Sequence, residues 1–151
     1  MKFKTLTLAA AVGAALASTF APTAQAQISD NAVRIGVLTD LSGAYSDLSG
    51  KGTVIATQMA IDDFMAKEKP GFKIEMVSAD HQNKGDIAAN KAREWFERGG
   101  VDVVSELVTT SVALAVQKIA KEKNRIALVS GAASTRVTNE DFRRCAGTAS
   151  D

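Results

Sequence analysis

The sequence is poor in the side chains that bind metals or form disulfides. Its 151 residues include one cysteine, Cys145, and one histidine, His81. A closed metal site needs more ligands than this pair can supply, so we predict no metal centre and no cofactor. With no second cysteine in the chain, Cys145 is expected to be a free thiol or to lack its partner.

The common motifs of nucleotide binding and catalysis are also missing. The spacing of Gly43, Gly50 and Gly52 does not match G-x-G-x-x-G. The sequence does not match the phosphate-binding motif G-x-x-x-x-G-K-[ST] either, because Tyr45 stands where its first glycine belongs and Gly52 replaces its Ser or Thr. No G-x-S-x-G elbow precedes a helix. His81 could act as a base, but it has no obvious nucleophile beside it, so we predict that the protein is not an enzyme.

The sequence has no large excess of positive or negative charge. The 18 Lys and Arg residues nearly balance the 17 Asp and Glu residues. A nucleic-acid partner favours a clustered basic face, so we predict none.

One apolar run stands at the start of the chain. Residues 6–17 are apolar but too few to span a bilayer, and Lys2 and Lys4 precede them. Ala24-Gln25-Ala26 then matches the small-x-small pattern that a signal peptidase cleaves. We expect residues 1–26 to be a signal peptide and residues 27–151 to form one exported domain that does not itself span the membrane.

After this segment, apolar runs alternate with amphipathic ones. The order predicts β-α-β-α-β-α-β, an α/β fold whose parallel sheet is covered by helices on both faces in three layers. We expect strands over 32–40, 72–80, 101–107 and from 125, and helices over 52–71, 85–100 and 109–124.

Apolar residues at helical spacing mark a face on each predicted helix. They are Ala56, Met59, Ala60 and Phe64 in the first helix, Ala88, Ala92, Trp95 and Phe96 in the second, and Val112, Ala115, Val116 and Ile119 in the third.

Small and hydroxyl residues follow the ends of the predicted strands. The carboxyl ends of parallel strands share one edge of a sheet, where ligands bind beside the helix amino termini. Thr109-Thr110-Ser111 lies after the third strand, and Gly131-Ala132-Ala133 with Ser134 lies after the fourth. One hydroxyl would suffice to cap a helix. The remaining hydroxyls stand near Gly131-Ala132-Ala133, whose small side chains leave the backbone N–H groups accessible. Hydroxyls and exposed N–H groups together favour a site for a small carboxylate. Asp40 and Asp80 are expected to cap the loops that follow them.

Three segments resemble a known family. "VRIGVLTDLSGAYSDLSGKG", "VSADHQNKGDIAANKAREW" and "NRIALVSGAAST" are similar to the first lobe of periplasmic leucine/isoleucine/valine-type amino-acid-binding proteins of ABC importers. The resemblance extends to about Asn139. It implies a type I periplasmic-binding-protein lobe that captures an amino acid, or a related small carboxylate or amide, in the periplasm. The lobe would present that solute to a membrane permease.

The resemblance also implies a set of ligand-binding residues. The loop after the first strand would contact the ligand's side chain, and the loops after the third and fourth strands would hold its carboxylate and ammonium. By motif these residues are Ser42, Gly43, Tyr45, Thr109, Thr110, Ser111, Ala132, Ala133 and Ser134.

The chain departs from this family in length. Members are typically more than twice as long, and their second lobe supplies the acid that pairs with the ligand's ammonium. We expect the chain to be a first lobe truncated before the second, as a fragment or through a disrupted reading frame, with Cys145 resembling a cysteine whose partner lies further on. Such a lobe would bind weakly and expose apolar surface. The alternatives are an exported sensor lobe that binds another protein, a small enzyme that uses His81, and a non-functional fragment.

Overall fold

The computed structural model describes residues 28–139, so the predicted signal peptide and Cys145 lie outside the described residues. The regular elements alternate along the chain as predicted. They are η1 (Ser29–Asn31), β1 (Ala32–Thr39), α1 (Gly50–Glu68), β2 (Lys73–Asp80), α2 (Gly85–Glu97), β3 (Val103–Glu106), α3 (Thr110–Glu122), β4 (Ile126–Val129) and η2 (Thr135–Val137).

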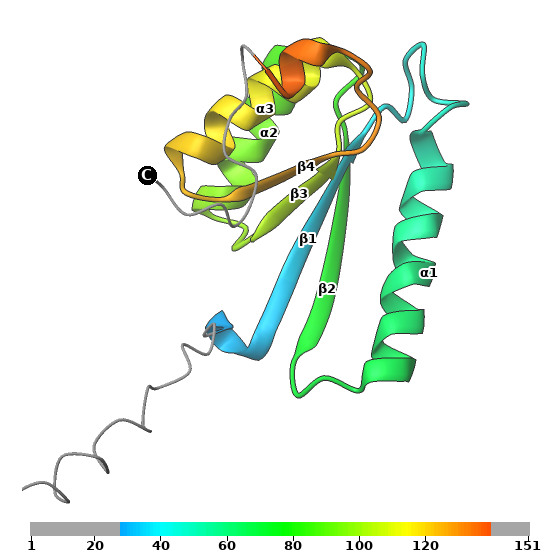
Figure 1. Cartoon of the computed structure of the whole chain (residues 1–151), viewed down its shortest axis with the longest axis vertical. Coiled ribbons are helices and arrows are strands. Elements are labelled where there is room, and N and C mark those ends of the chain that lie inside the picture. Colours follow the sequence, from blue (N-terminus) through cyan, green and yellow to red (C-terminus); the bar gives the residue numbers. More distant parts are fainter. Residues whose placement is uncertain (1–27, 140–151) are drawn as a thin grey trace, which may run out of the picture.

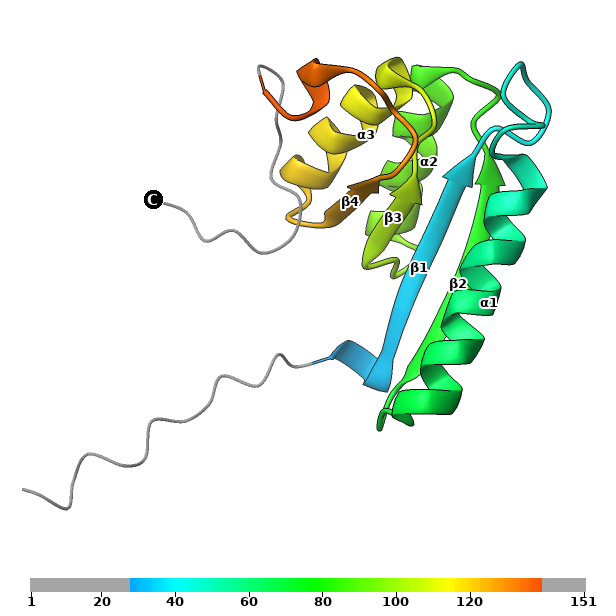
Figure 2. The same ribbon diagram turned by 45° about the vertical axis from the view of Figure 1, so that its right-hand side comes forward.

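The four strands form one parallel sheet in the order β2-β1-β3-β4. The chain moves from β1 to β2 in one direction and from β2 across to β3 and β4 in the other. Connections between parallel strands are right-handed, so reversing the direction puts the connecting helices on opposite faces. Figures 1 and 2 show α1 on one face and α2 with α3 on the other. The predicted three-layer α/β fold is confirmed.

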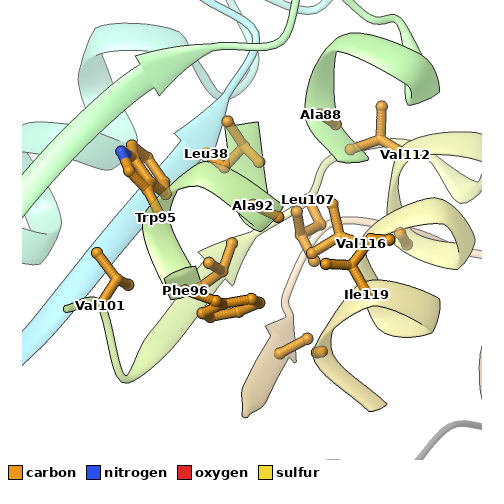
Figure 3. Close-up of a cluster of buried hydrophobic side chains, with 14 of the residues drawn as sticks. Leu38, Ala88, Ala92, Trp95, Phe96, Val101, Leu107, Val112, Val116 and Ile119 are labelled. Atoms are coloured by element: carbon orange, nitrogen blue, oxygen red, sulfur yellow. The ribbon is translucent and has the colours of Figure 1, made fainter. Parts of the chain in front are cut away.

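The main core lies between the sheet and the pair α2 and α3. Figure 3 shows side chains from both helices converging with Leu38 of β1 and Leu107. All four apolar residues predicted for the face of α2 are buried, because they recur at the helical period toward the sheet. Buried residues of α3 include Val112, Val116 and Ile119, which were predicted, and also Ala113 and Ala120.

The predicted apolar face of α1 is wrong. Met59 is 61% exposed and Phe64 is 42% exposed, whereas Ile61 is buried against the sheet. Apolar residues occur around the whole of this helix, so spacing alone could not say which side packs. Within residues 28–139, no helix, α1 included, is both long and apolar enough to cross a membrane.

Strand β3 is shorter than predicted at both ends. At its start, the Val101 N–H donates to the carbonyl of Trp95 and closes the end of α2. At its end, the last strand residue, Glu106, and the following Leu107 have φ values of 87° and 60°, so the backbone leaves the extended region there and the strand stops at Glu106. The chain therefore turns sharply just before the loop that leads into α3.

Candidate solute pocket

The reversal in strand order places β1 and β3 side by side while their connecting helices lie on opposite faces. In open α/β sheets, ligands bind in the crevice outside the strands' carboxyl ends at such a switch point. The structure has an open pocket of about 390 Å³ there, between the loops that follow β1, β3 and β4. It is lined by Tyr45, Leu48, Val108, Thr109, Thr110, Gly131, Ala133 and Ser134.

Five of the nine residues predicted for the site line this pocket. They are Tyr45, Thr109, Thr110, Ala133 and Ser134. Among the described residues, the lining does not include Ser42, Gly43, Ser111 or Ala132. Ser111 is exposed on α3, and Ala132 packs against the hydrophobic core. Leu48, Val108 and Gly131 line the pocket but were not predicted.

Two carboxylates hold the loop after β1. Asp40 caps the loop that follows it, as predicted, and Asp80 does so through the Gln82 N–H, but the contacts of Asp80 with the loop after β1 were not predicted. Asp40 is fully buried and accepts the N–H groups of Gly43 at 2.7 Å and Tyr45 at 2.9 Å. A Cβ on Gly43 would lie 2.5 Å from an Asp40 oxygen, so a larger residue there would have to displace the Asp40 carboxylate. These bonds hold the backbone from which the Tyr45 side chain reaches the pocket.

Asp80 holds the first part of the same loop. It accepts hydrogen bonds from the Ser42 hydroxyl and from the N–H groups of Leu41 and Gln82. Burial acts to raise the pKa of Asp80, but these hydrogen bonds outweigh it and lower the pKa below its ordinary value. The Ser42 hydroxyl is therefore committed to a carboxylate of the protein.

Thr109 precedes α3 at the position that normally caps a helix. Its backbone is extended, with φ −115° and ψ 151°, yet its side chain makes no capping hydrogen bond. The hydroxyl donates instead to Oδ1 of Asn83, at 2.9 Å, in the loop after β2. Capping, the alternative role considered for one of the three hydroxyls, is therefore not the role of Thr109. Asn83 was not predicted, because nothing in its spacing relates it to a residue 26 positions away.

Glu106 lies directly behind the pocket wall. Its side chain is buried, and Oε2 accepts the Val108 N–H at 3.0 Å. A Cβ on Gly131 would lie 3.1 Å from Oε1 of Glu106 and 2.8 Å from Cα of Val108. Burial raises the pKa of Glu106, and hydrogen bonds from Val108 and Thr39 offset this only in part. Because Gly131 has no side chain, the loops after β3 and β4 can approach each other closely at this position.

His81 is fully buried and neutral. Its Nδ1 accepts the Asn83 N–H at 2.9 Å, which requires the ring proton to be on Nε2. Burial lowers the pKa of His81 against the attraction of Asp40 and Asp80. His81 is not among the described residues that line the pocket, so it is poorly placed to act on a ligand there.

The described part of the pocket wall carries no charged side chain. It combines hydroxyls with an apolar side formed by Tyr45 and Leu48. Over residues 28–139, no group of three or more His, Cys, Asp or Glu side chains is arranged to hold a metal ion. The arrangement suits a small solute with a polar end and an apolar body.

Such a pocket, at the switch point of a doubly wound lobe, is typical of solute-binding proteins. The family model described as "Periplasmic binding protein" matches residues 32–150. The chain therefore belongs to the periplasmic binding protein family, a family of binding proteins and not of enzymes. None of the curated proteins compared with the sequence matches it significantly.

Solved structures of this type resemble the chain closely. A periplasmic binding protein from Burkholderia mallei is 45% identical with a TM-score of 0.69, over 75% of this chain and 30% of that one. A branched chain amino acid ABC transporter periplasmic ligand-binding protein from Burkholderia xenovorans LB400 is 43% identical with a TM-score of 0.63, over 70% of this chain and 28% of that one.

A more distant relative was solved with a ligand. This ABC transporter solute binding protein from R. palustris, in complex with 4-hydroxybenzoate, is 26% identical with a TM-score of 0.60. The match covers 73% of this chain and 29% of that one. The chain therefore matches about 30% of the length of these relatives.

Proposed function

We propose that the chain is the solute-binding component of an ABC importer, or the first lobe of one. It would capture an amino acid or a related small carboxylate in the periplasm and present it to a membrane permease, after residues 1–26 have directed its export. The observation that carries this proposal is the pocket at the switch point, where Thr109, Thr110 and Ser134 come from two separate loops. Family membership supports the same role.

Each polar group in the pocket has a distinct capacity for hydrogen bonding. The Ser134 oxygen accepts the N–H of Arg136 at 3.3 Å, so its own proton is available to donate to a carboxylate. Thr110 offers a second hydroxyl at the positive end of α3. The Thr109 proton is committed to Asn83, so the Thr109 oxygen is suited to accept from a ligand ammonium or hydroxyl.

Two classes of solute fit this arrangement. Relatives are named for branched-chain amino acids or were solved with 4-hydroxybenzoate, and both compounds join a carboxylate to an apolar body and a hydrogen-bond donor. Tyr45 and Leu48 would contact the apolar body. Leu48 is 78% exposed, which leaves a large apolar side chain available to a ligand.

Binding by this part of the protein alone is expected to be weak. The described pocket is open, and the relatives are about three times as long as the part that matches. By the resemblance, their second lobe contributes the acid that pairs with the ligand's ammonium. A ligand held only by hydroxyls and amides loses that ion pair.

Calorimetric titration with isoleucine and with 4-hydroxybenzoate tests the proposal. We expect Thr110→Val and Ser134→Ala each to weaken binding about 10- to 100-fold, because a charge-assisted hydrogen bond contributes about 1.5–3 kcal/mol. Ser111→Ala is the matched control, since it removes the next hydroxyl of α3, which is exposed and outside the lining. Equal losses in Thr110→Val and Ser111→Ala, or no binding of either solute to the wild type, would refute the proposal.

A further inference from the structure

The hydroxyl of Thr109 has two possible partners. As the residue before α3, it could turn to the N–H groups of Ser111 or Val112, which is the usual task of a threonine at this position. It contacts Asn83 instead, at 2.9 Å, and the helix start has no side-chain cap. Thr109 and Thr110 both line the pocket, so the uncapped turn lies at the pocket wall.

Asn83 is itself held firmly. Its backbone is left-handed, with φ 54°, a conformation that asparagine tolerates better than most residues. Its N–H donates to Nδ1 of the buried His81. The N–H of His81 in turn donates to the carbonyl of Thr39 at the end of β1, at 2.9 Å. The carboxamide therefore projects toward Thr109 from a turn anchored on the sheet.

We propose that Asn83 is a positioning residue of the solute pocket, which withholds the Thr109 hydroxyl from α3 and thereby leaves the first amides of that helix to the solute. The inference rests on the function proposed above. Asn83 contributes through Thr109 and is not among the described residues that line the pocket. Because α3 has no side-chain cap, the N–H groups of its first turn are available to donate to a carboxylate.

The variant Asn83→Gly separates the two partners of Thr109. Glycine adopts the left-handed backbone without strain and removes only the carboxamide. The released hydroxyl is then free to cap α3. We expect slower hydrogen exchange at the amide of Ser111 or Val112, and affinity for isoleucine or 4-hydroxybenzoate lowered about 2- to 10-fold. A purely structural role for Asn83 would instead speed exchange through a loosened helix start.

The control is Gln82→Gly. Gln82 is the neighbouring residue, is exposed and has a similar φ of 52°, so this variant reproduces the backbone change alone. In Gln82→Gly we expect exchange in the first turn of α3 and solute affinity to stay as in the wild type. In a Thr109→Val background, Asn83→Gly should change neither quantity, because no hydroxyl remains to be released.

The two measurements distinguish the ways of failing. If the wild type binds a solute but Asn83→Gly leaves exchange and affinity unchanged, the role of Asn83 is refuted while the proposed function stands. The role of Asn83 is also refuted if Asn83→Gly still changes exchange and affinity in the Thr109→Val background. If the wild type binds neither solute, the proposed function is refuted, and a slowed exchange in Asn83→Gly would then make Asn83 a structural partner of Thr109 only.

Discussion

At the scale of single residues, the candidate pocket depends on polar groups that the protein has already paired. Asp40 and Asp80 accept hydrogen bonds from N–H groups of the loop after β1, and Asn83 accepts one from the hydroxyl of Thr109. What remains for a solute is therefore a small set of groups on the loops after β3 and β4. Their usefulness depends on how closely those two loops approach each other.

Gly131 is the residue that permits this approach. In Gly131→Ala the new Cβ would stand 2.8 Å from Cα of Val108, a backbone atom that cannot move aside alone. We expect a loss of about 1–3 kcal/mol in the free energy of unfolding, measured by chemical denaturation, together with weaker solute binding.

The matched control is Gly52→Ala in α1, where a Cβ meets no heavy atom within 4 Å. That variant should gain up to about 1 kcal/mol, because alanine favours helix over glycine. Similar stability changes in the two variants would contradict the close approach at Gly131.

Glu106 makes the stability of the protein depend on pH. Its pKa in the folded state is raised above the ordinary value of 4.5, so folding favours the protonated carboxyl. This stabilising contribution is complete below the ordinary pKa and is lost as the pH rises through the raised one. Glu106→Gln keeps an acceptor for the Val108 N–H and carries no charge.

We therefore expect Glu106→Gln to exceed the wild type in stability at neutral pH by more than at about pH 4, where both side chains are neutral. Denaturant titrations over this pH range measure the difference. A difference that stays constant with pH would show that burial of the charge is not the cause.

The residues behind the pocket wall could not be inferred from sequence pattern. The loops after the strands were predicted because small and hydroxyl residues gather there. Nothing in the spacing shows that Glu106 turns inward or that Asn83 reaches Thr109, since both depend on backbone turns with positive φ. Such turns in non-glycine residues leave little trace in the sequence.

At the scale of elements, α2 is tied to the sheet through Trp95. A Cβ on Gly36 of β1 would stand 2.6 Å from the Trp95 ring, so the indole packs directly on the strand backbone. Trp95 and Phe96 were predicted as core residues and both are buried. This packing places the end of α2, and through it the start of β3, against β1.

We expect Trp95→Ala to cost about 3–5 kcal/mol in the free energy of unfolding, because it opens a cavity on the sheet that the backbone cannot fill. The control is Ile55→Ala on α1, where the side chain is 61% exposed. Its effect should stay within about 0.5 kcal/mol. Thermal or chemical denaturation measures both, and a comparable loss in Ile55→Ala would mean that α1 is more deeply packed than the structure shows.

The two helix layers differ in how well sequence predicts them. α2 and α3 each bury one apolar face between polar residues, so the helical period identifies it. α1 carries apolar residues on its packed side at Ile61 and on its outer side at Ile55 and Met59. Periodicity therefore predicts that α1 is a helix but not how it is turned.

At the scale of the whole molecule, the strand order β2-β1-β3-β4 determines where a site can form. The alternation of strands and helices predicts a parallel sheet, but the order of its strands comes from the structure. That order joins the loops after β1, β3 and β4 at one edge (Figure 2), and it explains why residues far apart in sequence share a pocket.

The central claim is that this edge holds the solute. Backbone amide shifts of the isotopically labelled chain, recorded by NMR during titration with isoleucine and with 4-hydroxybenzoate, test it most directly. We predict that the shifts of Thr109, Thr110 and Ser134 change together and saturate with at least one of the two solutes. Changes confined to other parts of the chain, such as the outer side of α1, or no change with either solute, would contradict the account.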